Sequence, residues 1–404
     1  MLPAEVDSRR AWSVCAAAAV AICLAFGTNY SFGAFFEAMA EDFDAGRGAT
    51  AVVFGVTSFL FFGTGVISGP LADRIGPRPL TAVGAVLMGA GLIATSRAGE
   101  LWIGVLTYGI GVGFGAGLFV TPMFSTVGGW FVRRRALALG LAATGSGLGT
   151  LVIVPTASRL IDAHGWRTTY MGLAVLDLVV IGAAAFVLAP APQSQAPPAA
   201  VDHMKLVAAT SAFRRFWLCG VLFTVAQSIA FAFVVDFATD EGVSSQAAAF
   251  VLALIGASSI LGRVGLTPLV VRLGSVRVVQ ISLLVVPAAF TLWLLAGGTY
   301  LLLIIFAVVL GVAYGAFVGI SSEVCAFLFG VVGLGGVIGM LYLGAGIGGL
   351  VGSPMAGVLA DVSSGRALPI AAGIAASAIA AVVALGLPHE PVDLEQPEMV
   401  TRAR

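Results

Sequence analysis

Charged side chains are scarce in this sequence. Lys, Arg, Asp and Glu make up 10% of its 404 residues, whereas a water-soluble domain carries roughly a quarter. The formal net charge is zero, and the sequence has no basic block of the kind that binds nucleic acid. The composition therefore excludes an ordinary soluble domain and gives no sign of a polyanionic partner.

Histidine and cysteine are also rare, and neither is clustered. The histidines, His164, His203 and His389, are expected in loops or in the tail, so none should lie inside a membrane segment. The four cysteines show no paired spacing of the kind that binds a metal ion. We therefore expect no metal site and no cofactor. A membrane-embedded enzyme is also not expected, since it would need catalytic side chains clustered at the end of a span.

Long apolar stretches dominate the chain instead. Hydrophobic residues make up 59% of it, and a membrane-spanning helix needs about 20 mostly apolar residues. Twelve such stretches are expected, at residues 12–36, 50–71, 80–96, 101–124, 136–157, 168–189, 213–235, 247–270, 277–296, 299–322, 331–353 and 367–387. The sequence thus predicts an all-α membrane protein with twelve transmembrane helices.

The basic residues are distributed unevenly among the connecting segments. If the N-terminus is cytoplasmic, the outer segments contain only five arginines, and most other basic residues lie in inner segments. Because basic residues concentrate on the cytoplasmic side of membrane proteins, we expect both termini there, in a plasma (inner) membrane. The first apolar stretch is too long for a cleavable signal peptide, so we expect it to be an anchor.

The chain divides near its middle into two halves of six spans. Residues 190–212 form a polar, proline-rich segment, which we expect to be a cytoplasmic linker. It separates residues 1–189 from residues 213–388, and residues 389–404 are expected to form a cytoplasmic tail.

The two halves share a sequence motif. The turn after the second span reads Gly-Pro-Leu-Ala-Asp-Arg-Ile-Gly-Pro-Arg at residues 69–78, and residues 267–277, after the eighth span, repeat its Pro, Leu, Arg and Gly positions. Internal repeats are typical of secondary transporters, which bind substrate between two related halves and rock them around it. We therefore expect two pseudo-symmetric six-helix bundles.

The first copy of this turn resembles the G-x-L-A-D-R-x-G-x-R signature of the major facilitator superfamily at every defining position. The resemblance implies the major facilitator fold and a latch that stabilises the outward-facing state. The latch residues would be Gly69, Asp73, Arg74, Gly76 and Arg78. Glycines permit a tight turn, and an acid can accept hydrogen bonds from a helix N-terminus. The same arginines could instead serve only to keep the loop in the cytoplasm.

Two further stretches resemble the monocarboxylate transporter family and its bacterial relatives. They are Tyr-Ser-Phe-Gly-Ala-Phe-Phe at residues 30–36 and the run at residues 130–147 that begins Trp-Phe-Val-Arg-Arg-Arg-Ala-Leu-Ala-Leu-Gly. With the repeat and the span order, the resemblance covers essentially the whole chain. It implies a transporter that moves a small monocarboxylate such as lactate or pyruvate with a proton, by alternating access. A monomer should suffice, because both halves of the site are present.

Arg263 is the one arginine expected within a span. An ionisable residue there is costly and marks a functional site, and a guanidinium matches a carboxylate through two parallel hydrogen bonds. The resemblance implies that Arg263 anchors the substrate carboxylate. Alternatively, it could reach the cytoplasm or bond helix carbonyls.

Other side chains are expected around the same cavity. They are Asn29, Tyr30, Phe119, Gln227, Ser259, Tyr314 and Tyr342. Each could equally pack or hydrogen-bond between helices. Animal members of the family typically place an aspartate one turn before Arg263, where this chain has Ser259, and some relatives place a lysine where it has Tyr30. The identity of the proton-coupling residue is therefore open.

Two acids are candidates for carrying the proton. Asp177 is expected in the middle of span 6, where an ionised carboxylate is costly, although a neutral structural acid would fit that scaffold span equally. Glu323 is expected at the inner end of span 10, a span that the family resemblance implies to line the cavity, although it could simply reach the cytoplasm. Asp236, Asp240 and Glu241 are expected to form a solvated rim at the outer end of span 7.

Alternative functions keep the fold but change the cargo. An organic-anion exchanger is one, although the span-11 lysine of oxalate–formate exchangers is absent. An exporter of a metabolite or drug is another, although span 5 lacks the G-x-x-x-G-P-x-x-G-G motif of drug exporters. A non-transporting membrane sensor is a remote alternative, since the polar tail is short.

Overall fold

The computed structural model of the protein describes residues 6–190, 200–330, 334–363 and 365–394. Within these ranges the regular elements are helices, without a strand. Twelve of the described helices are long and apolar enough to cross a membrane. The predicted fold class and number of spans are therefore confirmed.

The first half is built from eight α-helices and one π-helical turn. They are α1 (Arg9–Asp42), α2 (Arg47–Gly63), α3 (Gly65–Ile75), α4 (Pro77–Ser96), α5 (Leu101–Tyr108), η1 (Gly109–Phe114), α6 (Gly115–Trp130), α7 (Arg135–His164) and α8 (Trp166–Val187). The expected linker contains a helix that the sequence analysis did not foresee, α9 (Ala200–Ala209).

The second half repeats this plan with seven α-helices and one π-helical turn. They are α10 (Ser211–Asp240), α11 (Ser245–Ile260), η2 (Leu261–Gly265), α12 (Thr267–Leu273), α13 (Ser275–Ala296), α14 (Tyr300–Phe329), α15 (Leu334–Ser363) and α16 (Ala367–Leu385).

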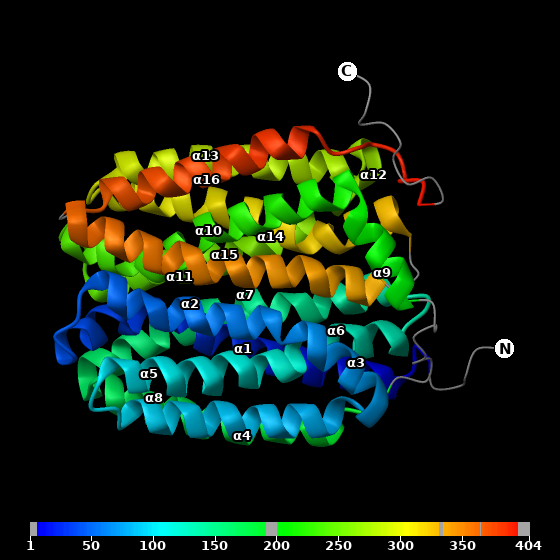
Figure 1. Ribbon diagram of the computed structural model, residues 1–404. Coiled ribbons are helices and arrows are strands. Elements are labelled where there is room, and N and C mark those ends of the chain that lie inside the picture. Colours follow the sequence, from blue (N-terminus) through cyan, green and yellow to red (C-terminus); the bar gives the residue numbers. More distant parts are fainter. Residues whose placement is uncertain (1–5, 191–199, 331–333, 364, 395–404) are drawn as a thin grey trace.

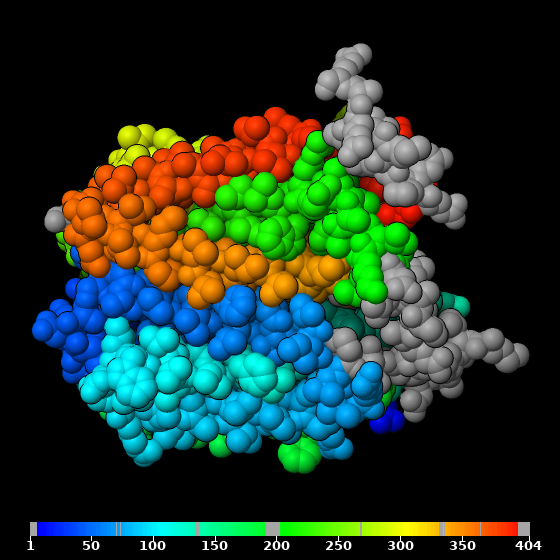
Figure 2. Space-filling model, viewed as in Figure 1, coloured from blue at the N-terminus to red at the C-terminus, as the bar shows by residue number. Residues whose placement is uncertain are grey.

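The helices of the two halves run along one common direction, with α1–α8 on one side of the molecule and α10–α16 on the other (Figure 1). The halves meet where α2 packs along α15, α7 along α11 and α1 along α10. Figure 2 shows the orange α15 lying against the blue part of the first half. Because the number of spans is even, α1 begins and α16 ends at the same end of the bundle. We call this the terminal end, and the opposite one the distal end.

The repeated turn has the same backbone conformation in both halves. Gly76 ends α3 and begins α4 with φ 84° and ψ 163°, and Gly274 ends α12 and begins α13 with φ 84° and ψ 154°. This conformation favours glycine over residues with a side chain. The internal sequence repeat thus corresponds to an internal structural repeat.

Candidate functional site

Arg263 lies at the junction between the two halves. It belongs to the π-helical turn η2, and its Nη1 donates hydrogen bonds to the carbonyl oxygen of Ala143 and the hydroxyl of Ser146, both on α7. Its Nε is buried and has no hydrogen-bond partner among the described residues. Arg263 also makes no ion pair within the described part of the chain. A buried donor without a partner is costly, so this guanidinium retains an unused capacity to bind an anion.

The local backbone provides room for the arginine. π-Helical turns are frequent at functional sites. On the facing helix α14, a Cβ atom added at Gly319 would lie 3.0 Å from Cγ of Arg263. The glycine therefore lets the arginine stem lie directly against α14.

Aromatic hydroxyls surround the arginine. The guanidinium carbon of Arg263 lies 5.6 Å from the ring centre of Tyr314, within the range of a cation–π contact. The hydroxyl oxygens of Tyr314 and Tyr30 are 3.4 Å apart, and Nε2 of Gln227 donates to the Tyr30 hydroxyl over 3.1 Å. Tyr342 of α15 lies at the junction of the halves, with its ring centre 6.0 Å from that of Phe62 of α2. The structure thus links three predicted residues, Tyr30, Gln227 and Tyr314, beside Arg263, and places Tyr342 at the same junction.

Asn29 is fully buried, and neither polar atom of its amide has a hydrogen-bond partner among the described residues. Neighbouring residues on α1 show which half of the protein the Asn29 side chain faces. Gly33, one turn later, approaches the Phe231 carbonyl of α10, and the rings of Phe36 and Phe233 are 4.8 Å apart. Side chains at such spacings share one face of a helix, so Asn29 belongs to the face of α1 that meets the second half.

Substituting Asn29 tests whether this amide is kept for a ligand. We expect Asn29→Leu to leave the melting temperature of the ligand-free protein unchanged or higher, because it removes a buried polar group without partners. Uptake of substrate should fall about fivefold or more, the loss expected for one hydrogen bond at the upper end of the usual range. Thermal unfolding and proteoliposome uptake on the same preparation decide the point. A lower melting temperature with unchanged uptake would make Asn29 a structural residue.

Two predicted residues do not join the group around Arg263. Phe119 is buried within the first half, and a Cβ at Gly84 of α4 would lie 2.5 Å from its ring. The hydroxyl of Ser259 donates to the Gly256 carbonyl oxygen within its own helix over 2.6 Å. Neither side chain is free to contact a substrate beside Arg263 in this structure.

The two candidate proton carriers occupy different surroundings. Asp177 is fully buried between α8 and α1, and Thr28 donates its hydroxyl hydrogen to the carboxylate, with Oγ1 2.9 Å from Oδ2. The Tyr108 hydroxyl donates to the Thr28 carbonyl oxygen over 2.9 Å. Glu323 is exposed and lies one turn after Gly319 on α14. Asp177 is therefore held inside the first half, whereas Glu323 is exposed and lies one turn from Gly319, which adjoins the stem of Arg263.

One expectation about the acids at the distal end is wrong. Asp236 does not belong to a solvated rim, because it is only 3% exposed and accepts a hydrogen bond from Nε of Arg47 over 2.9 Å. Asp240 also pairs with Arg47, although it remains exposed. The sequence contained the signal, since these opposite charges were expected at the same end, but it could not show that the two helices meet.

The expected latch is described only in part. Gly76 forms the turn, Arg74 is exposed, and nothing lies within 4 Å of a Cβ added at Gly69. Arg78 donates from Nη2 to the Phe186 carbonyl oxygen of α8 over 3.0 Å. The side chain of Asp73 lies outside the described residues. A latch function remains a prediction.

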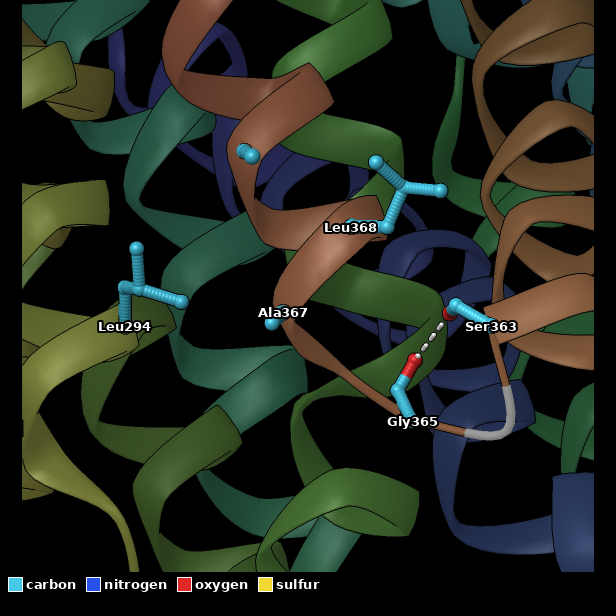
Figure 3. A pocket seen from close by; sticks show the side chains of 6 residues that line it. Leu294, Ser363, Gly365, Ala367 and Leu368 are labelled. Carbon is cyan, nitrogen blue, oxygen red and sulfur yellow. Dashed lines mark hydrogen bonds between the residues drawn. The ribbon is translucent and has the colours of Figure 1, made fainter.

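A separate hollow lies at the distal end of the second half (Figure 3). Its lining is Leu294, Ser363, Gly365, Ala367, Leu368 and Ala371. The one polar side chain among them, Ser363, donates its hydroxyl to the Gly365 carbonyl oxygen over 3.0 Å. None of these described lining residues is charged, so they do not offer the chemistry that an anion needs.

The chain is similar in sequence to known transporters. Residues 18–286 and 216–403 match the profile of the Major Facilitator Superfamily. Monocarboxylate transporter 3 of Rattus norvegicus is 31% identical over 88% of this chain and 75% of its own length. Monocarboxylate transporter 11 of Homo sapiens is 30% identical over 88% of this chain and 78% of its own length. An MFS-type transporter of Aspergillus niger, pynF, is 28% identical over 89% of this chain and 83% of its own length.

Solved structures share the fold at low sequence identity. A bacterial homologue of the human lysosomal transporter Spinster, inward-facing and unoccupied, has a TM-score of 0.76 at 15% identity, covering 94% of this chain and 97% of that one. A D-xylose–proton symporter has a TM-score of 0.75 at 13% identity, covering 94% of this chain and 98% of that one.

Proposed function

This chain belongs to the major facilitator superfamily and, within it, to the monocarboxylate transporter family, and we propose that it moves a small monocarboxylate such as lactate or pyruvate by alternating access. It is a multi-pass membrane transporter rather than an enzyme. The cargo, the coupling ion and the direction of transport belong to the proposal.

The observation that carries the proposal is the guanidinium of Arg263, which lies between the halves and forms no ion pair with a described residue. The planar guanidinium of an arginine offers two edges for hydrogen bonding, and none of the described acids forms an ion pair with Arg263. A bound carboxylate would supply that charge and satisfy the buried Nε. The hydroxyls of Tyr30 and Tyr314 could then bond a second oxygen of a hydroxy or keto acid.

The orientation follows from the basic residues. We place the terminal end in the cytoplasm and the distal end outside the cell, because basic residues are concentrated in the segments on the side of the termini. The membrane would be the plasma (inner) membrane, and a single chain supplies both halves of the site.

A proton is proposed to travel with the carboxylate. Glu323 is the better-placed carrier, because it is exposed rather than enclosed within one half and its helix touches the stem of Arg263 one turn away. Asp177 is the alternative, since Thr28, which bonds it, directly precedes Asn29 and Tyr30 on α1. In either case, neutralising one of two opposite charges lowers the cost of moving them through a medium of low dielectric constant.

One observation favours anion exchange as a second candidate function. Without an ion-paired acid beside it, Arg263 in the empty carrier would keep an uncompensated charge within a membrane-spanning segment, which is costly. In the loaded carrier, the bound carboxylate would cancel the charge of Arg263. Return of the empty carrier would then be slow, and one anion would leave as another enters.

Uptake of labelled lactate and pyruvate into proteoliposomes tests both functions. An inward proton gradient should stimulate net uptake by the wild-type protein if the carrier is a symporter. Uptake that depends on unlabelled substrate inside the vesicles would favour exchange. No uptake under either condition by correctly folded protein would discard these two substrates.

Two isosteric substitutions identify the proton carrier. We expect Glu323→Gln to reduce gradient-driven uptake about tenfold or more while leaving exchange intact, because exchange does not require deprotonation. Asp177→Asn should preserve both activities, since its amide can still bond Thr28. Loss of gradient stimulation in Asp177→Asn alone would reverse the assignment. If gradient stimulation of uptake persists in both variants, neither acid carries the coupled proton.

A further inference from the structure

Arg47 connects the two halves through side-chain ion pairs at the distal end. It begins α2 of the first half and pairs with Asp236, 2.9 Å from Nε, and with Asp240, both in the last turns of α10 of the second half. The other two ion pairs between described residues each stay within one half, namely Arg167 with Asp42 and Arg366 with Glu241. Of the ion pairs in which both partners are described, only those of Arg47 cross between the halves.

A second contact reinforces the same point. Asp361, in the last turn of α15, accepts hydrogen bonds from the backbone N–H groups of Arg47 over 2.9 Å and Gly48 over 2.8 Å. The N-cap residue of α2 is Gly46, which has no side chain that could cap the helix. The second half thus supplies the acidic cap that a helix N-terminus favours.

The packing around Arg47 leaves little room between the halves. A Cβ added at Gly357 of α15 would lie 2.6 Å from the Arg47 carbonyl oxygen and from Cα of Gly48. Asp236 is 3% exposed and the Arg47 side chain 30% exposed. Removing one partner of such a partly buried pair leaves the other without compensation, which costs more than losing a fully exposed pair.

We propose that Arg47 is the distal gate of the carrier, holding its distal end closed by joining Asp236 and Asp240 while Asp361 caps α2. Opening the distal end requires these contacts to break. The gate favours the distal-closed state, and its loss shifts the population toward the distal-open state. The proposal depends on alternating access but not on the identity of the cargo.

Pulsed electron–electron resonance measures this population without substrate. Spin labels at Gly99, in the loop between α4 and α5, and at Gln246, near the start of α11, report the separation of the halves at the distal end. Both positions are exposed and outside the gate. The labels are placed in a variant without native cysteines, reconstituted in lipid nanodiscs. Because no cargo is added, a wrong substrate assignment cannot affect the result.

We expect Arg47→Ala to raise the ratio of distal-open to distal-closed protein about tenfold. Asp236→Asn should shift it in the same direction and provides a second variant if Arg47→Ala does not fold. The exchanged pair Arg47→Asp with Asp236→Arg should restore part of the closed population. Arg167→Ala is the matched control, since its ion pair with Asp42 is at the same end but within one half, and should leave the ratio unchanged. Equal ratios in Arg47→Ala, Asp236→Asn and Arg167→Ala would overturn the proposal.

Discussion

Replacing Arg263 by alanine is expected to reduce uptake of the monocarboxylate at low concentration about 30-fold or more. Truncating one partner of a buried, hydrogen-bonded charge pair costs about 2–5 kcal/mol, and each 1.4 kcal/mol is about a factor of ten in affinity. The substrate carboxylate would lose the cation that compensates for its dehydration. Initial uptake rates over a range of substrate concentrations give the change.

A conservative variant separates charge from geometry. Arg263→Lys keeps the positive charge but replaces the planar fork by a single ammonium group, so we expect an intermediate loss. Arg272→Ala removes an exposed arginine just beyond the same span and should leave uptake unchanged. Equal uptake in wild type and Arg263→Ala, at equal protein density in the vesicles, would remove Arg263 as the anchor.

The second large effect is expected where α11 crosses α14 beside Arg263. A Cβ added at Gly315 would lie 2.0 Å from the Ser259 carbonyl oxygen, and one added at Gly262 would lie 2.1 Å from the Val312 carbonyl oxygen. These are backbone atoms, which cannot move aside as a flexible side chain can. Gly315→Ala must therefore separate the two helices. We expect its melting temperature to fall by about 5 °C or more, and uptake to fall with it.

A matched glycine in open surroundings provides the control. Nothing lies within 4 Å of a Cβ added at Gly172 of α8. Gly172→Ala adds the same methyl group and improves helix propensity by up to about 1 kcal/mol, so its melting temperature should stay equal or rise slightly. If Gly315→Ala unfolds at the same temperature as Gly172→Ala, the close crossing of α11 and α14 is not a feature of the folded protein.

The features that the sequence predicted are those that the membrane imposes. A bilayer requires long apolar helices, so the spans could be counted, and the costs of a buried charge singled out Arg263. The repeated glycine turn could be recognised because only a few residues tolerate the conformation at Gly76 and Gly274. These inferences depend on local sequence and on the solvent, not on tertiary packing.

The missed features depend on which helix faces meet. In apolar spans every face is hydrophobic, so the pattern of residues does not reveal that Phe119 packs inside the first half while Tyr30 faces the second. The pairing of Arg47 with Asp236 joins residues 189 positions apart, and no local motif announces it. The π-helical turn that contains Arg263 was also not foreseen, because its residues are compatible with an ordinary α-helix.

Binding of labelled pyruvate to the purified protein tests the central claim most directly. Lactate should displace it, whereas lactamide, which has similar size but no carboxylate, should not, and Arg263→Ala should bind neither acid measurably. This result would establish recognition of a monocarboxylate through Arg263. Competition by lactamide equal to that by lactate, or undiminished pyruvate binding by Arg263→Ala, would contradict it.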